Sequence, residues 1–301
     1  MSLDHWYLLP VGFAIAFLAM SSGISAGNFW VPVYLLWAKF EPPLAFWMTL
    51  ATMLCGYGSG VARHLCQGTI DRRVITLYLP FTVLAALVGG YLAPALNVFW
   101  LILLFGVFVF GYGMRMLVQA ARQAGRNGYG GPSDDPRWPS SPVAGEGTGG
   151  GQPPPQVGEG VRATLYTAMR ERGIGALGGL LLGLIAVGLG ELLLPRLLAE
   201  RKALSPGQVV GSTVLVIFVA SLAAALARLN GPFLAALGEQ RATLLGAMLF
   251  AGPGVLVGGQ LGPMMARRLN TRALRWYVAI ILLLVGVLML VRFLALLTFA
   301  R

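Results

Sequence analysis

The chain is built from long apolar runs that no water-soluble fold accommodates. They fall at about 7–38, 43–66, 74–93, 98–118, 174–199, 206–229, 243–266 and 273–299. Several reach the roughly 20 residues that a helix needs to cross a bilayer. Of the 301 residues, 57% are hydrophobic and only 11% are charged, which is too little charge to cover a soluble surface. We therefore predict an all-α, multi-pass protein of the cell (inner) membrane, with the lipid bilayer as its solvent.

The remaining composition excludes several classes of partner. A net charge of +11 could indicate nucleic-acid binding in a soluble protein, but here the arginines lie between apolar runs, where they act as topology signals. The chain has two histidines and two cysteines, and no metal-ligand spacing. Cys55 and Cys66 would lie about 16 Å apart along one helix, too far for a disulfide. We expect no nucleic-acid partner, no metal and no cofactor; the oligomeric state is not readable.

A change of composition divides the chain in two. Residues 119–173 are rich in Gly, Pro and Ser and contain few large aliphatic side chains, which predicts a flexible linker. It separates a first membrane repeat, 1–118, from a second, 174–301. The two halves resemble each other: GNFWVP at 27–32 matches GELLLP at 190–195, and GGYLAP at 89–94 matches GGQLGP at 258–263. An internal duplication of this kind is common in secondary transporters.

The distribution of arginine and lysine predicts how the halves are oriented. The first run of each half is too long for one helix and is broken by glycines. If each break is a re-entrant hairpin, every basic cluster lies on the cytoplasmic side, together with the linker, and both termini lie outside. These clusters are Arg63, Arg72 and Arg73; Arg115, Arg122 and Arg126; Arg196, Arg201 and Lys202; and Arg267, Arg268, Arg272 and Arg275. We predict two inverted repeats, each with a Gly-broken hairpin followed by three transmembrane helices.

The glycine breaks predict a binding site. Helix N-termini carry partial positive charge and free N–H groups, so two short helices that begin near Asn28 and Glu191 would attract a small anion. Gly27 and Gly190 would let the backbone approach the ligand closely. For Gly89 and Gly90, and for their counterparts in the second half, close helix packing is an equal alternative.

Glu191 is the most informative single residue, because it lies within the apolar stretch IAVGLGELLLP and its repeat partner is Asn28. A carboxylate in such surroundings is costly and usually functional. It could carry a coupling proton, since burial disfavours the charged form of a carboxyl group. It could instead neutralise an arginine, or accept the free N–H groups of its own half-helix.

Small hydroxyls accompany the breaks and complete the candidate substrate site. They are Ser25, Thr49, Ser212 and Thr213, which could donate to oxyanion oxygens or bond within their own helices. Ser25 also lies in a G-x-S-x-G pattern, which is typical of hydrolase nucleophiles. That motif needs a strand-to-helix turn and a histidine base, and this chain is helical throughout with His5 and His64 in distant segments. We therefore predict that the protein is not an enzyme and has no catalytic residues.

The combined pattern resembles a known family. A Gly-rich break ending in Pro, a helix bearing Ser or Thr (AFWMTLATM and VVGSTVLVIF) and a GG-x-L-x-P turn each occur twice, as in the TauE/SafE family of sulfite and organosulfonate exporters. The likeness covers both membrane halves but not the linker. Where the family usually shows only glycines, this chain has Asn28 and Glu191. The resemblance implies export of sulfite, sulfoacetate or another organosulfonate.

Two functions remain open at this point. A secondary transporter working by alternating access, with protons coupled through Glu191, fits a duplicated single chain. A passive anion channel would use the same half-helix ends without coupling, although pore-lining rings normally come from symmetric oligomers.

Overall fold

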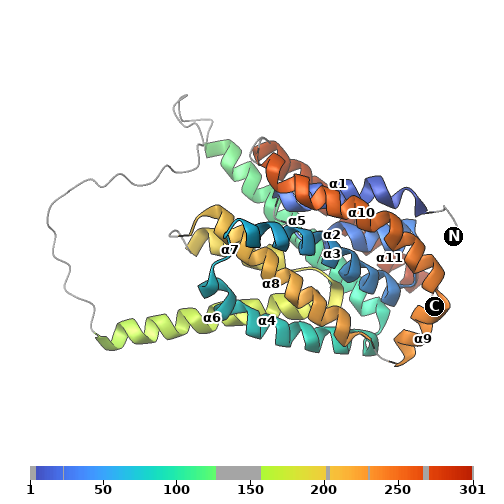
Figure 1. Ribbon diagram of the computed structural model, residues 1–301, viewed down its shortest axis with the longest axis horizontal. Coiled ribbons are helices and arrows are strands. Elements are labelled where there is room, and N and C mark those ends of the chain that lie inside the picture. The colour runs from blue at the N-terminus through green and yellow to red at the C-terminus, as the bar shows by residue number, and fades with distance from the viewer. Residues whose placement is uncertain are drawn as a thin grey trace.

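The computed structural model describes residues 5–22, 24–126, 157–200, 204–229, 231–266 and 271–299, and these residues form an all-helical bundle (Figure 1). The helices are α1 (Leu8–Ser22), α2 (Gly27–Pro32) with the π-helical turn Val33–Trp37, α3 (Pro42–Cys66), α4 (Arg72–Leu92), α5 (Val98–Arg126), α6 (Val157–Ile185), α7 (Leu189–Glu200), α8 (Pro206–Ala227), α9 (Gly231–Glu239), α10 (Arg241–Ala266) and α11 (Thr271–Phe299). The helices α3, α4, α5, α8, α10 and α11 are each long and apolar enough to cross a membrane. The predicted fold class, an all-α polytopic membrane protein, is confirmed.

Local sequence explains where several helices start. Asp71 caps α4 by accepting hydrogen bonds from the backbone N–H groups of Arg73 and Val74. Ser205 and Gln208 form a reciprocal capping box at the start of α8. Both α3 and α8 begin with proline, whose missing N–H is not needed in the first turn.

The segment predicted as a linker is partly helical. Residues 119–126 continue α5 and residues 157–173 begin α6, while 127–156 lie outside the described residues. The domain boundaries of the sequence analysis therefore stay a prediction.

Helices of one half pack against helices of the other. The first helix of each half packs against the helix in the third apolar run of the other half, so α1 lies along α10 and α4 lies along α6 (Figure 1). The corresponding helices α5 and α11 pack on each other, as do α3 and α8. The hydrophobic core is thus shared by both halves.

Close glycine contacts fix the direction of the helices around the first break. Gly254 of α10 lies against Leu9 of α1, and Gly258, one turn later, lies against Phe13. The helices α1 and α10 are therefore parallel. Gly56 lies against Val255 and Gly259 lies against Ser59, so α3 is also parallel to α10. Because α1 and α3 run in the same direction, α2 must return between them, which makes the first break a hairpin.

The second break has the same form. Gly175, Gly179 and Gly183 of α6 lie successively against Tyr78, Thr82 and Ala86 of α4, so these helices are parallel. Contacts of Asp71 with Ser212 and of Gly90 with Ala224 make α8 parallel to α4 as well. The short helix α7 therefore returns between α6 and α8.

The last helix of each half runs against its counterpart. Gly106 of α5 lies against Leu290, and Gly113 of α5 lies against Leu283 of α11. The position on α11 moves backwards as α5 advances, so the two helices are antiparallel. The same holds for α3 and α8, where Gly58 meets Phe218 and Gly60 meets Val214.

Gly89, Gly90, Gly258 and Gly259 all lie at helix–helix contacts. A Cβ at Gly89 would lie 2.5 Å from the Leu180 carbonyl oxygen, and one at Gly258 would lie 2.4 Å from that of Phe13. Both distances are shorter than any van der Waals contact allows. Of the two readings that the sequence left open for these glycines, the structure supports close packing.

The α4–α6 contact gives a test of this packing. A Cβ at Gly179 would lie 2.2 Å from the Thr82 carbonyl oxygen. We expect Gly179→Ala to destabilise the protein by about 1–3 kcal/mol, the usual cost of overpacking. Gly173→Ala, in the same helix with no atom within 4 Å of the new Cβ, is the control. Thermal unfolding in detergent measures both, and equal midpoints for the two variants would contradict the assigned packing.

Candidate functional site

The two helix breaks meet inside the bundle. The first lies between α1 and α2, and the second lies between α6 and α7. A Cβ at Gly27 would lie 2.1 Å from the Ala186 carbonyl oxygen, so the breaks touch only because residue 27 has no side chain. Two short helices from different halves therefore begin side by side.

The backbone of the second break turns through the left-handed region. Ala186 has φ 59° and Gly188 has φ 110°. Glycine adopts such a conformation without penalty, whereas alanine is strained there. These two residues reverse the chain between α6 and α7.

Glu191 joins the two breaks. Its Oε1 accepts hydrogen bonds from the Ser25 backbone N–H at 2.9 Å and from Asn28 Nδ2 at 2.5 Å. Its Oε2 accepts one from the Gly188 N–H at 3.1 Å, which is the reach-back of a glutamate at the third position of a helix. The Glu191 side chain is 1% exposed. One carboxylate therefore satisfies donors from both halves.

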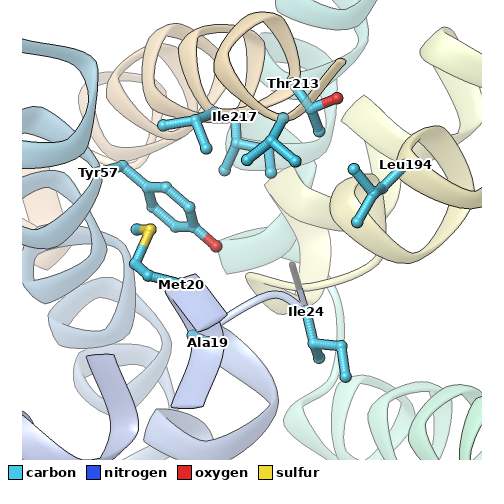
Figure 2. Close-up of a pocket in the computed structure, with 9 residues that line it drawn as sticks. Ala19, Met20, Ile24, Tyr57, Leu194, Thr213 and Ile217 are labelled. Atoms are coloured by element: carbon cyan, nitrogen blue, oxygen red, sulfur yellow. The ribbon is translucent and has the colours of Figure 1, made fainter. Parts of the chain in front are cut away.

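Glu191 and the three residues that donate to it, Ser25, Asn28 and Gly188, form what we call the Glu191 cluster. Tyr57 of α3 lies next to it. Its hydroxyl accepts a hydrogen bond from the Ala26 backbone N–H at 3.3 Å. Figure 2 shows the same hydroxyl pointing into a cavity between the first break and the helices α3, α7 and α8, with Thr213 on the opposite wall. The other lining side chains are apolar, among them Met20, Leu194 and Ile217.

The cavity is small in this conformation. The space that it offers to the centre of a water-sized sphere is about 20 Å³, which is room for about one water molecule. A sulfonate is larger than that. The described helices must therefore move before an ion of that size can occupy the cavity.

A comparison with protein families identifies the chain. The model of the sulfite exporter TauE/SafE family matches residues 8–289, which is nearly the whole sequence. The chain belongs to the TauE/SafE family. The match covers both breaks and the helices around them, and it agrees with the resemblance carried by the sequence motifs. No curated protein and no solved structure matches the chain.

Membership of the TauE/SafE family sets the general function. It is a family of membrane exporters for sulfite and related sulfur anions, so a small anion and the lipid bilayer are the partners that this chain shares with it. The family is one of transporters and not of enzymes. The multi-pass architecture agrees with this assignment.

The structure brings together most, but not all, of the residues predicted to form the site. Ser25, Gly27, Asn28, Gly190 and Glu191 lie at the two breaks, and all of them are buried.

The other three predicted hydroxyl residues do not all lie at the breaks. Thr213 lines the cavity into which the Tyr57 hydroxyl points, although its own hydroxyl donates to the Val209 carbonyl. Thr49 donates to Ala45 of its own helix. Ser212 accepts from the Asp71 N–H in the α3–α4 connection. Neither Thr49 nor Ser212 has a hydrogen bond to the Glu191 cluster in the described part of the chain.

Sequence analysis missed two residues at the breaks. Tyr57 lies in the motif CGYGSG, where a polar aromatic residue between glycines in an apolar run was the available signal. Arg228 donates to the carbonyls of Gly183 and Leu184 at the end of α6. Its signal was a single arginine that closes the apolar run AAALAR.

We expect the protein to lose stability when the Glu191 side chain is truncated. Glu191→Ala leaves the N–H groups of Ser25 and Gly188 and the Asn28 amide without their acceptor, at about 1–3 kcal/mol for each buried group. We expect a clear fall in the thermal midpoint of the detergent-solubilised protein. Glu239→Ala, which removes an exposed glutamate from α9, should leave the midpoint unchanged. If the two variants melt together, Glu191 does not hold the breaks.

Proposed function

We propose that this TauE/SafE member exports a small sulfur-containing oxyanion, such as sulfite, sulfoacetate or another organosulfonate, by alternating access. The observation that carries the proposal is the position of the Glu191 carboxylate between the two breaks. Backbone N–H groups and an amide already surround the two carboxyl oxygens there. The same donors suit the oxygens of a sulfite or sulfonate group.

Glu191 is the proposed coupling group. An anion that uses these donors must either displace an ionised carboxylate or find it protonated, because two negative charges repel in a buried site. Proton binding to Glu191 and anion binding to the breaks then favour each other. Thermodynamic linkage makes this effect reciprocal.

The substrate site consists of the residues at the breaks and the adjoining cavity. Gly27 and Gly190 would let the backbone approach the anion closely. Ser25 and Asn28 supply polar groups beside Glu191, and Thr213 supplies one at the wall of the cavity. Thr49 and Ser212 would join the site only in another conformation, because their hydroxyls are engaged elsewhere in this one.

The alternating-access movement is proposed to arise from the two inverted repeats. The proposal is supported by the antiparallel packing of α5 with α11 and of α3 with α8, which are corresponding helices of the two halves. If each half can adopt the conformation of the other, the closed cavity opens first to one side and then to the other. The basic loops and the segment 119–173 are proposed to be cytoplasmic, with both termini outside. Membrane potential then favours anion exit by about 2.3 kcal/mol per charge per 100 mV.

Anion binding to the purified protein tests the proposed site. We would titrate sulfoacetate at about pH 6 and about pH 8, a range in which model carboxyl groups stay ionised. Because protonation of Glu191 removes a competing charge, we expect tighter binding at the lower pH, by at most about tenfold per pH unit for one linked proton. Glu191→Gln, which is neutral at both values, should bind with no pH dependence.

Sulfite, taurine, sulfate and chloride serve as comparison ligands in the same assay. Unchanged pH dependence in Glu191→Gln would make Glu191 a structural residue and place coupling elsewhere. In vesicles, flux that saturates and follows a proton gradient indicates a transporter. Flux that rises linearly with potential would instead support the passive anion channel.

The proposed orientation has a separate test. Cys66 is exposed at the end of α3 and lies on the proposed cytoplasmic side of α4. In intact cells we expect no reaction of Cys66 with a membrane-impermeant maleimide in a Cys55→Ala background. Asn97→Cys, at the other end of α4 in a protein without native cysteines, should react. The opposite labelling pattern would reverse the proposed topology.

A further inference from the structure

Arg228 is a buried cation without a matching anion. It follows the last turn of α8 and is only 3% exposed. Among the described residues it forms no ion pair, and its hydrogen bonds all go to neutral carbonyls. An unpaired charge in the interior of a membrane protein is costly and usually functional.

The guanidinium uses only part of its donor capacity. Its Nη2 donates to the carbonyls of Gly183 at 2.6 Å and Leu184 at 2.8 Å, in the last turn of α6. This places a positive charge at the negative end of a helix. The buried Nε has no hydrogen-bond partner in the described part of the chain. Nε and Nη2 form the edge with which arginine binds the two oxygens of an oxyanion. Nε is free on this edge, whereas Nη2 is held by the two carbonyls, so an anion that binds here takes a hydrogen bond from them.

A second cavity adjoins Arg228. It lies between the start of α3 and the α4–α5 connection, with Phe46 and Phe233 among the aromatic lining residues and with Pro94 and Leu96 from the connection. Arg228 is the one charged side chain among the described residues that line it. Leu96 is 41% exposed, so the cavity lies just beneath the surface at this end of the bundle.

We propose that Arg228 forms a second binding site for the sulfur oxyanion, separate from the Glu191 cluster. The inference rests on the proposed function. It places a binding site for the substrate at the end of the bundle that holds the α4–α5 connection, which is the proposed outer side. The Nε edge binds two oxygens of the sulfite or sulfonate group. The Phe46 ring lies against the same guanidinium, 5.8 Å from its central carbon to the ring centroid, and helps to hold it at the cavity.

This site is linked to the second break through Arg228 itself. The same guanidinium holds the final carbonyls of α6 on one side of the break, while Glu191 holds the Gly188 N–H on the other. An anion on the Nε edge competes with the carbonyls for the arginine. Binding of the anion at Arg228 therefore weakens the hydrogen bonds that hold the end of α6.

The cavity must widen to accept its ligand. In this conformation it offers about 30 Å³ to the centre of a water-sized sphere, which is room for one or two water molecules. Because Pro94 and Leu96 belong to a short connection between helices, a shift of the α4–α5 connection is sufficient to enlarge the space.

A comparison of two arginines tests the proposal. Arg292 of α11 also donates to a backbone carbonyl, that of Leu35 at 2.7 Å, but it lines neither cavity. We would titrate sulfoacetate into the purified wild type, Arg228→Gln, Arg228→Lys and Arg292→Gln. The wild type should bind sulfoacetate at two sites. We expect Arg228→Gln to weaken binding at one of them at least about tenfold and to leave the other unchanged. Arg228→Lys should weaken that site less, because lysine keeps the charge and loses the two-donor edge. Arg292→Gln should stay within about twofold of the wild type.

The outcomes separate this proposal from the function on which it rests. If the wild type binds and Arg228→Gln binds equally well, the Arg228 site is wrong and the proposed function stands. Equal weakening in Arg228→Gln and Arg292→Gln would also overturn the site, since it would trace the effect to lost carbonyl contacts. If the wild type binds none of the sulfur anions, both proposals are wrong.

A second measurement leaves Arg228 in place. Leu96→Cys, in a protein without native cysteines, puts a thiol at the cavity. We expect sulfoacetate to slow its reaction with an uncharged methanethiosulfonate at least about fivefold, because a bound anion blocks the cavity. Asn97→Cys, one residue outside the lining, should react at the same rate with and without sulfoacetate. Unchanged labelling of Leu96→Cys would contradict occupancy of this cavity.

Discussion

The carboxylate of Glu191 holds together two pieces of chain that are separated by more than half of the sequence. A break in a buried helix exposes N–H groups that neither lipid nor apolar side chains can satisfy. Glu191 accepts from both breaks and Tyr57 accepts from the first, so the breaks are stable only when the two halves are assembled. The contact of Gly27 with Ala186 depends on the same assembly.

This arrangement places opposite charges at the two sides of the second break. Arg228 caps the end of α6 with positive charge, and Glu191 caps the start of α7 with negative charge. Each matches the partial charge of the helix end that it meets. In the proposed mechanism the proton binds Glu191, while the anion competes for the groups that Glu191 and Arg228 hold, so that ligand binding would act on both sides of the break.

The glycine contacts serve the same purpose at a larger scale. Gly12, Gly175, Gly254 and Gly258 lie where α1 meets α10 and where α4 meets α6. Small residues let parallel helices approach closely. The first helix of each half therefore packs on the opposite half.

From the sequence alone one could predict the membrane class, the repeated motifs, the two helix breaks and the presence of a carboxylate, that of Glu191, at the second break. These follow from hydrophobic length, repeated Gly and Pro positions and a carboxylate in an apolar run, all of which are local signals. The donors that Glu191 meets, the positions of Tyr57 and Arg228 beside the breaks and the bond of Ser212 to Asp71 were visible only in the folded chain. Those contacts join residues far apart in the chain, and their partners depend on how the two halves interlock, which no local pattern records.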